Sequence, residues 1–163
     1  MKSVLISIKP KWCEKIASGE KTIEVRRSAP IRNLPFKVYI YCTKGKQVKH
    51  CVTYYASGKV IGEFICRGIM QPLSSLHLMA KESCLTEEEL ANYSNGKQLY
   101  GWHISDLKIY DKPKNLSEFF KLCPTRENGD CLSCDCLADN DYGGVCTNNL
   151  TRPPQSYMWV EEL

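Results

Sequence analysis

The segment SGEKTIEVRR, residues 18–27, is the part of the chain around which the fold prediction is built. It follows an apolar run at residues 4–8 and a short segment with Pro10 near its start and Gly19 just past its end. Proline at the start and glycine after the end are typical of an α-helix. Within the segment Ile23 and Val25 alternate with polar residues, which is the pattern of a strand with one buried face. We therefore predict a strand, a helix and a second strand in this order.

Four residues of this segment match the G-x-K-x-x-E-x-R signature of the ASCH domain, a family of the PUA-like β-barrel group: Gly19, Lys21, Glu24 and Arg26. GWHIS at residues 101–105 and RPPQS at residues 152–156 also resemble segments of small bacterial and phage members. The resemblance extends over nearly the whole chain except roughly residues 123–149. It implies a PUA-like fold.

Length and composition are those of an ordinary globular domain, with 163 residues, 43% hydrophobic and 25% charged. Thr86 and Glu89 occupy the capping-box positions of a helix that should end before Asn95. A further short helix is predicted around residues 116–120. Alternating apolar residues predict further strands at residues 36–42, 59–70, 99–110 (ended by Asp111-Lys112-Pro113) and 155–160. Without regular βαβ alternation, we predict an α+β fold: one domain over residues 1–163, a mixed β-barrel with short flanking helices.

Lys21, Glu24 and Arg26 are the leading candidates for a site. Strand parity puts Glu24 and Arg26 on one face, whereas Lys21 joins them only if the chain bends at Lys21-Thr22. Glu24 could accept a hydrogen bond from an exocyclic amine, and Arg26 could bind a carbonyl or phosphate oxygen. Lys21 could bind an anion or act as a base, so Lys21 and Glu24 are the candidate catalytic pair. The alternative is a row of ion pairs on the surface.

Further ligand contacts are predicted from aromatic, basic and polar side chains near this segment. Aromatic rings can stack on a base, a basic loop can contact phosphate, and a histidine can orient a ligand. For each of these residues the alternative is a packing or solvated role. Trp12, on the apolar stripe of the first helix, has the same two interpretations, and core packing is the expected one. The five candidates are Tyr41, Lys44, Trp102, His103 and Ser156.

Ten cysteines fall into two groups. Those in the first half lie among apolar neighbours and are interpreted as buried hydrophobes. The others lie in a polar, glycine-rich insertion at residues 123–149, before the last strand. This insertion can hardly bury a core of its own. A structural zinc ion bound by four of these thiolates is one interpretation, and free thiols or disulfides are the others. The candidate ligands are Cys123, Cys131, Cys134, Cys136 and Cys146.

Charge and hydropathy limit the partners. The formal net charge of +4 permits an anionic ligand without demanding one. There is no 18-residue apolar run and no signal-peptide pattern, so we expect a cytoplasmic protein without a membrane partner. The family resemblance implies RNA, a nucleotide or a nucleoside as the natural partner. A regulatory protein with the cysteine-rich insertion as its interface remains a further possibility.

The family resemblance implies two functions. ASCH domains resemble PUA domains, which are linked to RNA, so the first is binding of RNA, a nucleotide or a modified base. The second is suggested by a branch of the family that looks like amidohydrolases of N4-acetylcytidine. The lysine of that branch corresponds to Lys21, but Glu24 stands where the branch has threonine. The later carboxylate of the branch falls near Glu82.

Overall fold

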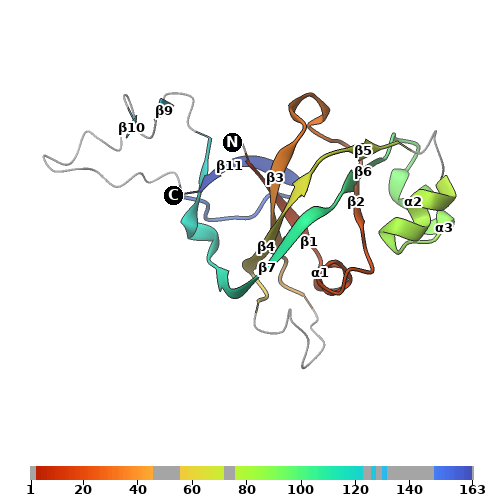
Figure 1. The fold of residues 1–163 in the computed structure, drawn as a ribbon, viewed down its shortest axis with the longest axis horizontal. Coiled ribbons are helices and arrows are strands. Elements are labelled where there is room, and N and C mark those ends of the chain that lie inside the picture. Colours follow the sequence, from red (N-terminus) through yellow and green to blue (C-terminus); the bar gives the residue numbers. More distant parts are fainter. Residues whose placement is uncertain are drawn as a thin grey trace, which may run out of the picture.

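A computed structural model describes residues 3–45, 56–71, 76–122, 126–127, 130–131 and 149–162. It is a mixed α+β fold with one large curled sheet and three short helices (Figure 1). No helix in these stretches has the length and apolar character needed to cross a membrane. The helices are α1 (Pro10–Ala17), α2 (Leu76–Ser83) and α3 (Glu87–Ser94), with short 3-10 turns at Ile31–Asn33 and Leu116–Glu118. The strands are β1 (Ser3–Ile8), β2 (Ile23–Arg26), β3 (Phe36–Cys42), β4 (Lys59–Cys66), β5 (Ile69–Met70), β6 (Tyr100–His103), β7 (Ser105–Lys114), β8 (Phe119–Lys121), β9 (Arg126–Glu127), β10 (Asp130–Cys131) and β11 (Tyr157–Glu162).

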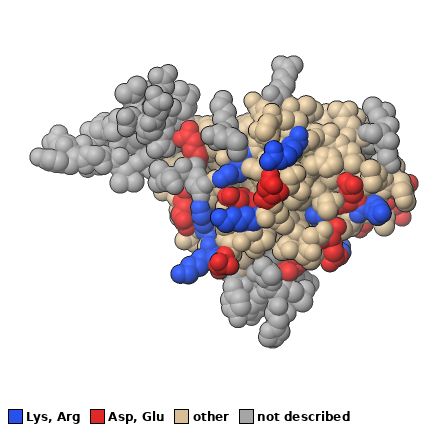
Figure 2. Space-filling model, viewed as in Figure 1, with Lys and Arg blue, Asp and Glu red and all other residues tan. Residues whose placement is uncertain are grey.

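The large sheet has six strands in the order β7-β4-β3-β1-β11-β8. Strand β1 runs parallel to β3 and antiparallel to β11, and every one of its residues is buried. Continuous burial explains why four of the six residues of β1 are large and aliphatic, as expected of a strand covered on both faces. The face of the molecule in Figure 2 carries Lys and Arg interleaved with Asp and Glu, without a continuous basic stripe.

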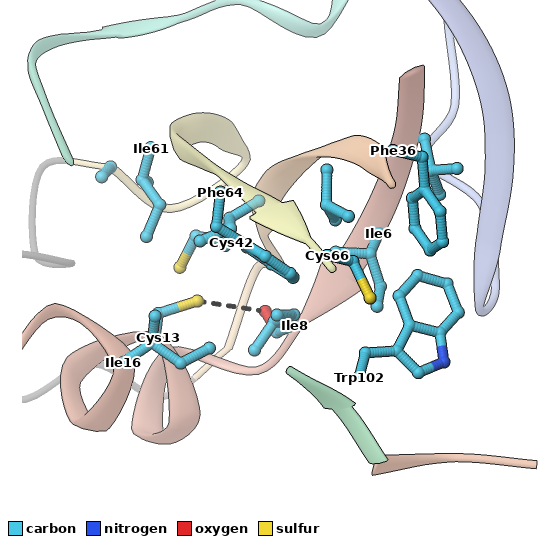
Figure 3. Close-up of a cluster of buried hydrophobic side chains, with 14 residues drawn as sticks. Ile6, Ile8, Cys13, Ile16, Phe36, Cys42, Ile61, Phe64, Cys66 and Trp102 are labelled. Carbon is cyan, nitrogen blue, oxygen red and sulfur yellow. Dashed lines mark hydrogen bonds between the residues drawn. The ribbon is translucent and has the colours of Figure 1, made fainter. Parts of the chain in front are cut away.

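Two hydrophobic clusters cover the two faces of β1. Val4, Ile6 and Ile8 belong to the larger cluster, together with Cys13 and Ile16 of α1. Figure 3 shows Ile8 of this cluster beside Cys13 and Ile16. Leu5, from the alternate position, belongs to the other cluster with residues of β3, β8 and β11. The helix α1 is therefore held against the sheet by the apolar stripe that the sequence predicts.

The predicted closed barrel is wrong in one respect, because the large sheet remains open. Its edge strands β7 and β8 do not pair with each other in the described part of the chain. The signature strand β2 does not join this sheet either. It pairs with β6, which also pairs with β5, in a separate three-stranded sheet. Strands that could have closed the barrel are thus used in the second sheet, while irregularities in the β3–β4 and β4–β7 pairings, with the extra residues in β4 and β7, favour the curl of the large sheet.

Three local predictions change for physical reasons. Pro113 does not end its strand but lies within β7, which is an edge strand where a missing N–H costs no ladder hydrogen bond. The run 99–110 divides at Ile104 into β6 and β7, and the run 59–70 divides into β4 and β5. The helix predicted at 116–120 is a 3-10 turn followed by β8. The helix α2 was not predicted.

Other predictions are confirmed. Thr86 and Glu89 form the capping box of α3, and the left-handed residue Asn95 follows its end. Cys13, Cys42 and Cys66 are buried, as expected of small hydrophobes, whereas Cys84 is only half-buried and Cys51 lies outside the described residues. The side chains of the five cysteines in the insertion at 123–149 lie outside the described part, so the insertion and its zinc ion remain predictions.

Candidate functional site

Lys21 reaches Glu24, but the chain turns at Gly19, before the predicted bend at Lys21-Thr22. Gly19 has φ +80°, a left-handed conformation suited to glycine, and turns the chain out of α1. The backbone N–H of Thr22 then donates to the carbonyl of Glu82 at 2.9 Å, which ties the turn to α2. The strand β2 begins only at Ile23, so Lys21 precedes it and escapes strand parity.

Lys21, Glu24 and Arg26 form a buried charged cluster. The Lys21 ammonium lies 3.3 Å from one oxygen of Glu24, and the Arg26 guanidinium lies 3.0 Å from the other. The side chains of Lys21, Glu24 and Arg26 are only 3%, 8% and 11% exposed. The interpretation as a row of ion pairs on the surface is therefore wrong. Charges removed from water to this extent need compensation, and here one carboxylate compensates two cations.

Two backbone carbonyls accept hydrogen bonds from the cations of the cluster. Lys21 Nζ donates to the carbonyl of Ser83 at 2.8 Å, the last residue of α2, where the helix dipole places negative partial charge. Arg26 Nη2 donates to the carbonyl of Ser7 in β1 at 2.5 Å. Arg26 Nε is buried with no partner among the described residues. The cluster thus joins β2 to α2 on one side and to the large sheet on the other.

The charged cluster lies on the wall of a cleft of about 530 Å³. A volume of this size is within the range of small-molecule sites, about 300–1,000 Å³. Three cations and two carboxylates line it, and Glu89, one of the two carboxylates, also accepts from the backbone N–H of Thr86. The cleft therefore has a small positive excess. Its lining residues are Ser7, Ile8, Lys9, Trp12, Lys21, Glu24, Val25, Arg26, Thr43, Leu85, Glu89, Tyr93, Pro153, Pro154 and Gln155.

Aromatic and proline residues supply the other walls of the cleft. Trp12 of α1 is half-buried and lines the cleft with Lys21 Nζ 5.2 Å from its ring centre. Tyr93 of α3 lines it as well. Ser7 Oγ donates to the carbonyl of Pro154 at 2.6 Å and holds the segment before β11 against β1. Trp12 packs against the larger hydrophobic cluster, as expected, and also lines the cleft, since an apolar helical stripe looks the same for a core and for a cleft wall. Tyr93 is a lining aromatic residue that was not singled out from the sequence.

The five other predicted contacts do not line this cleft. Trp102 is fully buried, and its ring packs edge-on against Phe36 at 5.5 Å and Tyr157 at 4.9 Å. Tyr41 is buried in the second hydrophobic cluster. The other three also lie away from the lining: Lys44, which is exposed, His103, which is half-buried, and Ser156, whose carbonyl accepts from the N–H of Ser7. Trp102 is in the core because its side of β6 faces the large sheet.

Two buried thiols, those of Cys13 and Cys42, belong to the larger hydrophobic cluster. The interaction of the Cys13 thiol with the Cys42 thiol raises the pKa of Cys13, and burial raises it further. The same interaction lowers the pKa of Cys42, against the opposing effect of burial. Cys13 Sγ also donates to the carbonyl of Ile8, as Figure 3 shows. Both side chains are fully buried, so neither thiol is offered to a ligand as a nucleophile. Within the described stretches no three His, Cys, Asp or Glu side chains are grouped to bind a metal ion.

Comparison with known proteins identifies relatives of one kind. A family model described as the ASCH domain matches residues 6–114. A curated protein from Zymomonas mobilis, named ASCH domain-containing ribonuclease, is 31% identical over 97 residues, which span 60% of each of the two chains. The crystal structure of ASCH from Zymomonas mobilis has a TM-score of 0.63 and 23% identity, covering 98% of this chain and 88% of that one. A single-substitution variant of the same protein has a TM-score of 0.61 and 22% identity, covering 99% of this chain and 91% of its own.

Proposed function

The chain belongs to the ASCH domain family, and from this membership we propose that it acts on RNA and binds one nucleotide in the cleft beside Lys21, Glu24 and Arg26. The curated relative that is named a ribonuclease supports RNA as the partner. Because this relative is named a ribonuclease, we extend the proposal to cleavage of the RNA backbone.

The observation that carries the proposal is the buried charged cluster on the cleft wall. A carboxylate offers about four lone-pair positions, and the two cations occupy only part of this capacity. Glu24 would accept a hydrogen bond from the exocyclic amine of a base such as cytosine. Lys9, Lys21 and Arg26 together outnumber the lining carboxylates, and this excess suits a phosphate group. In cleavage, the same cations would offset negative charge that develops on the phosphate.

The charge distribution supports a local contact rather than attraction by a broad basic surface. The whole chain has a formal net charge of only +4, and the face in Figure 2 carries both signs interleaved. An RNA partner would therefore be recognised mainly in the cleft.

Removal of an acyl group from N4-acylated cytidine is the second candidate function. It is favoured by the contact of the Lys21 ammonium with the Glu24 carboxylate inside the cleft, since hydrolysis requires a proton acceptor and a stabilising cation. The third residue suggested by the family branch is not supported, because Glu82 is not among the residues that line the cleft. Of the lysine, threonine and carboxylate of the amidohydrolase branch, only the lysine has a firm counterpart in this chain, Lys21.

A titration followed by NMR would test the proposed binding without any substitution. Cytidine monophosphate is added to ¹⁵N-labelled protein, and we expect the amide signals of Ser7, Thr43 and Gln155, which surround the cleft, to shift. The amides of Lys108 and Lys112 on β7 are the internal control and should stay in place. Absence of shifts at saturating nucleotide, or shifts confined to β7, would contradict the proposal.

Two activity assays on the same preparation would separate the candidate reactions. Short labelled RNA is incubated with the protein and resolved on a gel, and N4-acetylcytidine is incubated separately and assayed for acetate. RNA cleavage that is lost in Lys21→Met, with a melting curve showing that the variant is folded, would support the first candidate. Acetate release without RNA cleavage would favour the second and overturn the first.

A further inference from the structure

Two pairs of a cation and an aromatic ring flank the charged cluster. Lys11 Nζ lies 4.4 Å from the ring centre of Trp12 on α1, and the Arg27 guanidinium lies 5.3 Å from the ring centre of Tyr93 on α3. Both rings line the cleft, whereas neither cation does. Figure 1 shows the strand β2, to which Glu24 and Arg26 belong, between α1 and α3. The two pairs therefore mark two sides of the cleft.

The cations of these pairs are positioned for a partner in solvent. Lys11 and Arg27 are both exposed, and in the described part of the chain neither is within ion-pair distance of a carboxylate. Tyr93 is 37% exposed, which is unusual for a ring that is merely part of a core. With the lining residues included, five cations and two carboxylates surround the cleft. Most of the formal net charge of the chain is thus concentrated here.

We propose that the protein recognises a single-stranded stretch of RNA rather than a free nucleotide, with one nucleotide in the cleft and its two neighbours on the Lys11–Trp12 and Arg27–Tyr93 pairs. This inference rests on the proposed function and deepens it. Aromatic rings stack on any base, and nearby cations bind the phosphates that link one nucleotide to the next. A cleft of about 530 Å³ has room for one nucleotide, so the neighbours of a bound nucleotide must lie on its rim, where both pairs are.

The test compares ligands of different length. Fluorescein-labelled cytidine mononucleotide and a cytidine pentanucleotide are used, both with 2′-fluoro sugars that lack the hydroxyl needed for cleavage. Fluorescence anisotropy gives the dissociation constant of each over a range of salt concentrations. Because stacking of one base contributes about 1–3 kcal/mol, the pentanucleotide should bind at least about fivefold more tightly than the mononucleotide.

The variants separate the rim from the cleft. Lys11→Ala/Arg27→Ala removes two phosphate contacts, so the slope of log K against log salt for the pentanucleotide should fall by about 1.4, at about 0.7 per contact. Binding of the mononucleotide should weaken much less, because it makes no contact with Lys11 or Arg27. Lys108→Ala/Lys112→Ala is the matched control, because it removes two exposed lysines from β7, away from the cleft. Tyr93→Leu keeps an apolar side chain and should weaken pentanucleotide binding by about fivefold or more.

The outcomes distinguish this inference from the proposed function. Equal affinities for the mononucleotide and the pentanucleotide would show that the rim contacts do not exist. So would an equal decrease of the salt-dependence slope in Lys11→Ala/Arg27→Ala and in the control Lys108→Ala/Lys112→Ala. Both results would leave a nucleotide site in the cleft. If neither ligand binds the wild-type protein, both the rim contacts and the proposed function are wrong.

Discussion

Replacing Glu24 by Gln removes the negative charge that lies between two buried cations. Glu24 contacts Lys21 at 3.3 Å and Arg26 at 3.0 Å, and all three side chains are nearly inaccessible to water. Glutamine is close in size, so the substitution leaves the packing intact and isolates the effect of charge. We expect Glu24→Gln to be folded and clearly destabilised.

The expected magnitude follows from these distances. At an effective dielectric constant of about 20, each contact contributes roughly 5 kcal/mol of gross attraction, most of which is offset by desolvation. Removing one partner from a buried ion pair typically costs about 3–5 kcal/mol. Lys21 and Arg26 retain their backbone acceptors, so about 3 kcal/mol is the expected loss. Lys21→Met leaves Glu24 paired with Arg26 and should cost less, about 1–2 kcal/mol.

Urea unfolding at equilibrium measures these differences. At about 2–4 °C per kcal/mol for a chain of this size, thermal unfolding should show Glu24→Gln melting about 6–12 °C below the wild-type protein. Added phosphate should raise the melting temperature of Glu24→Gln more than that of the wild-type protein, because two cations in the cleft lack a counterion. If Glu24→Gln is as stable as the wild-type protein, or Lys21→Met is the less stable variant, the account of the charged cluster is refuted.

Three further predictions concern the scaffold. Gly62→Ala would bring a Cβ atom against a backbone carbonyl of β7, so we expect the free energy of unfolding in urea to fall by about 1–3 kcal/mol. Gly45→Ala is the control, because its Cβ atom would meet only Pro10, at 3.6 Å, and its stability should not change. Thr86→Ala removes the capping box of α3 and should cost about 1 kcal/mol, while Thr86→Ser should restore most of it; equal stability of the two variants would contradict this. Burial raises the pKa of the Cys66 thiol from 9.0 to about 11, so the unfolded chain loses this proton first. The resulting stabilisation is complete below pH 9.0 and is lost as the pH rises towards 11, by at most about 1.4 kcal/mol per pH unit, and Cys66→Ala should show a shallower decline.

Features that depend on neighbouring residues could be predicted from the chain alone. Pro10 and Gly19 delimit α1, and Thr86 with Glu89 starts α3, because capping is decided within one helical turn. Alternation along β2 also puts Glu24 and Arg26 together, since side chains in a strand repeat every second residue. The α+β class and the signature of the family follow from patterns of this local kind.

The tertiary structure decided the features that depend on distant residues. Lys21 reaches the cluster because Ser83, 62 positions away, supplies its backbone acceptor, and the cleft gains its proline wall because Ser7 binds Pro154 across 147 positions. An apolar stripe does not say what it will face, so Trp12 could be assigned to the core although it lines the cleft. Closure of the barrel was mispredicted for the same reason. Pairing between strands depends on which edges meet in space, and β2 met β6.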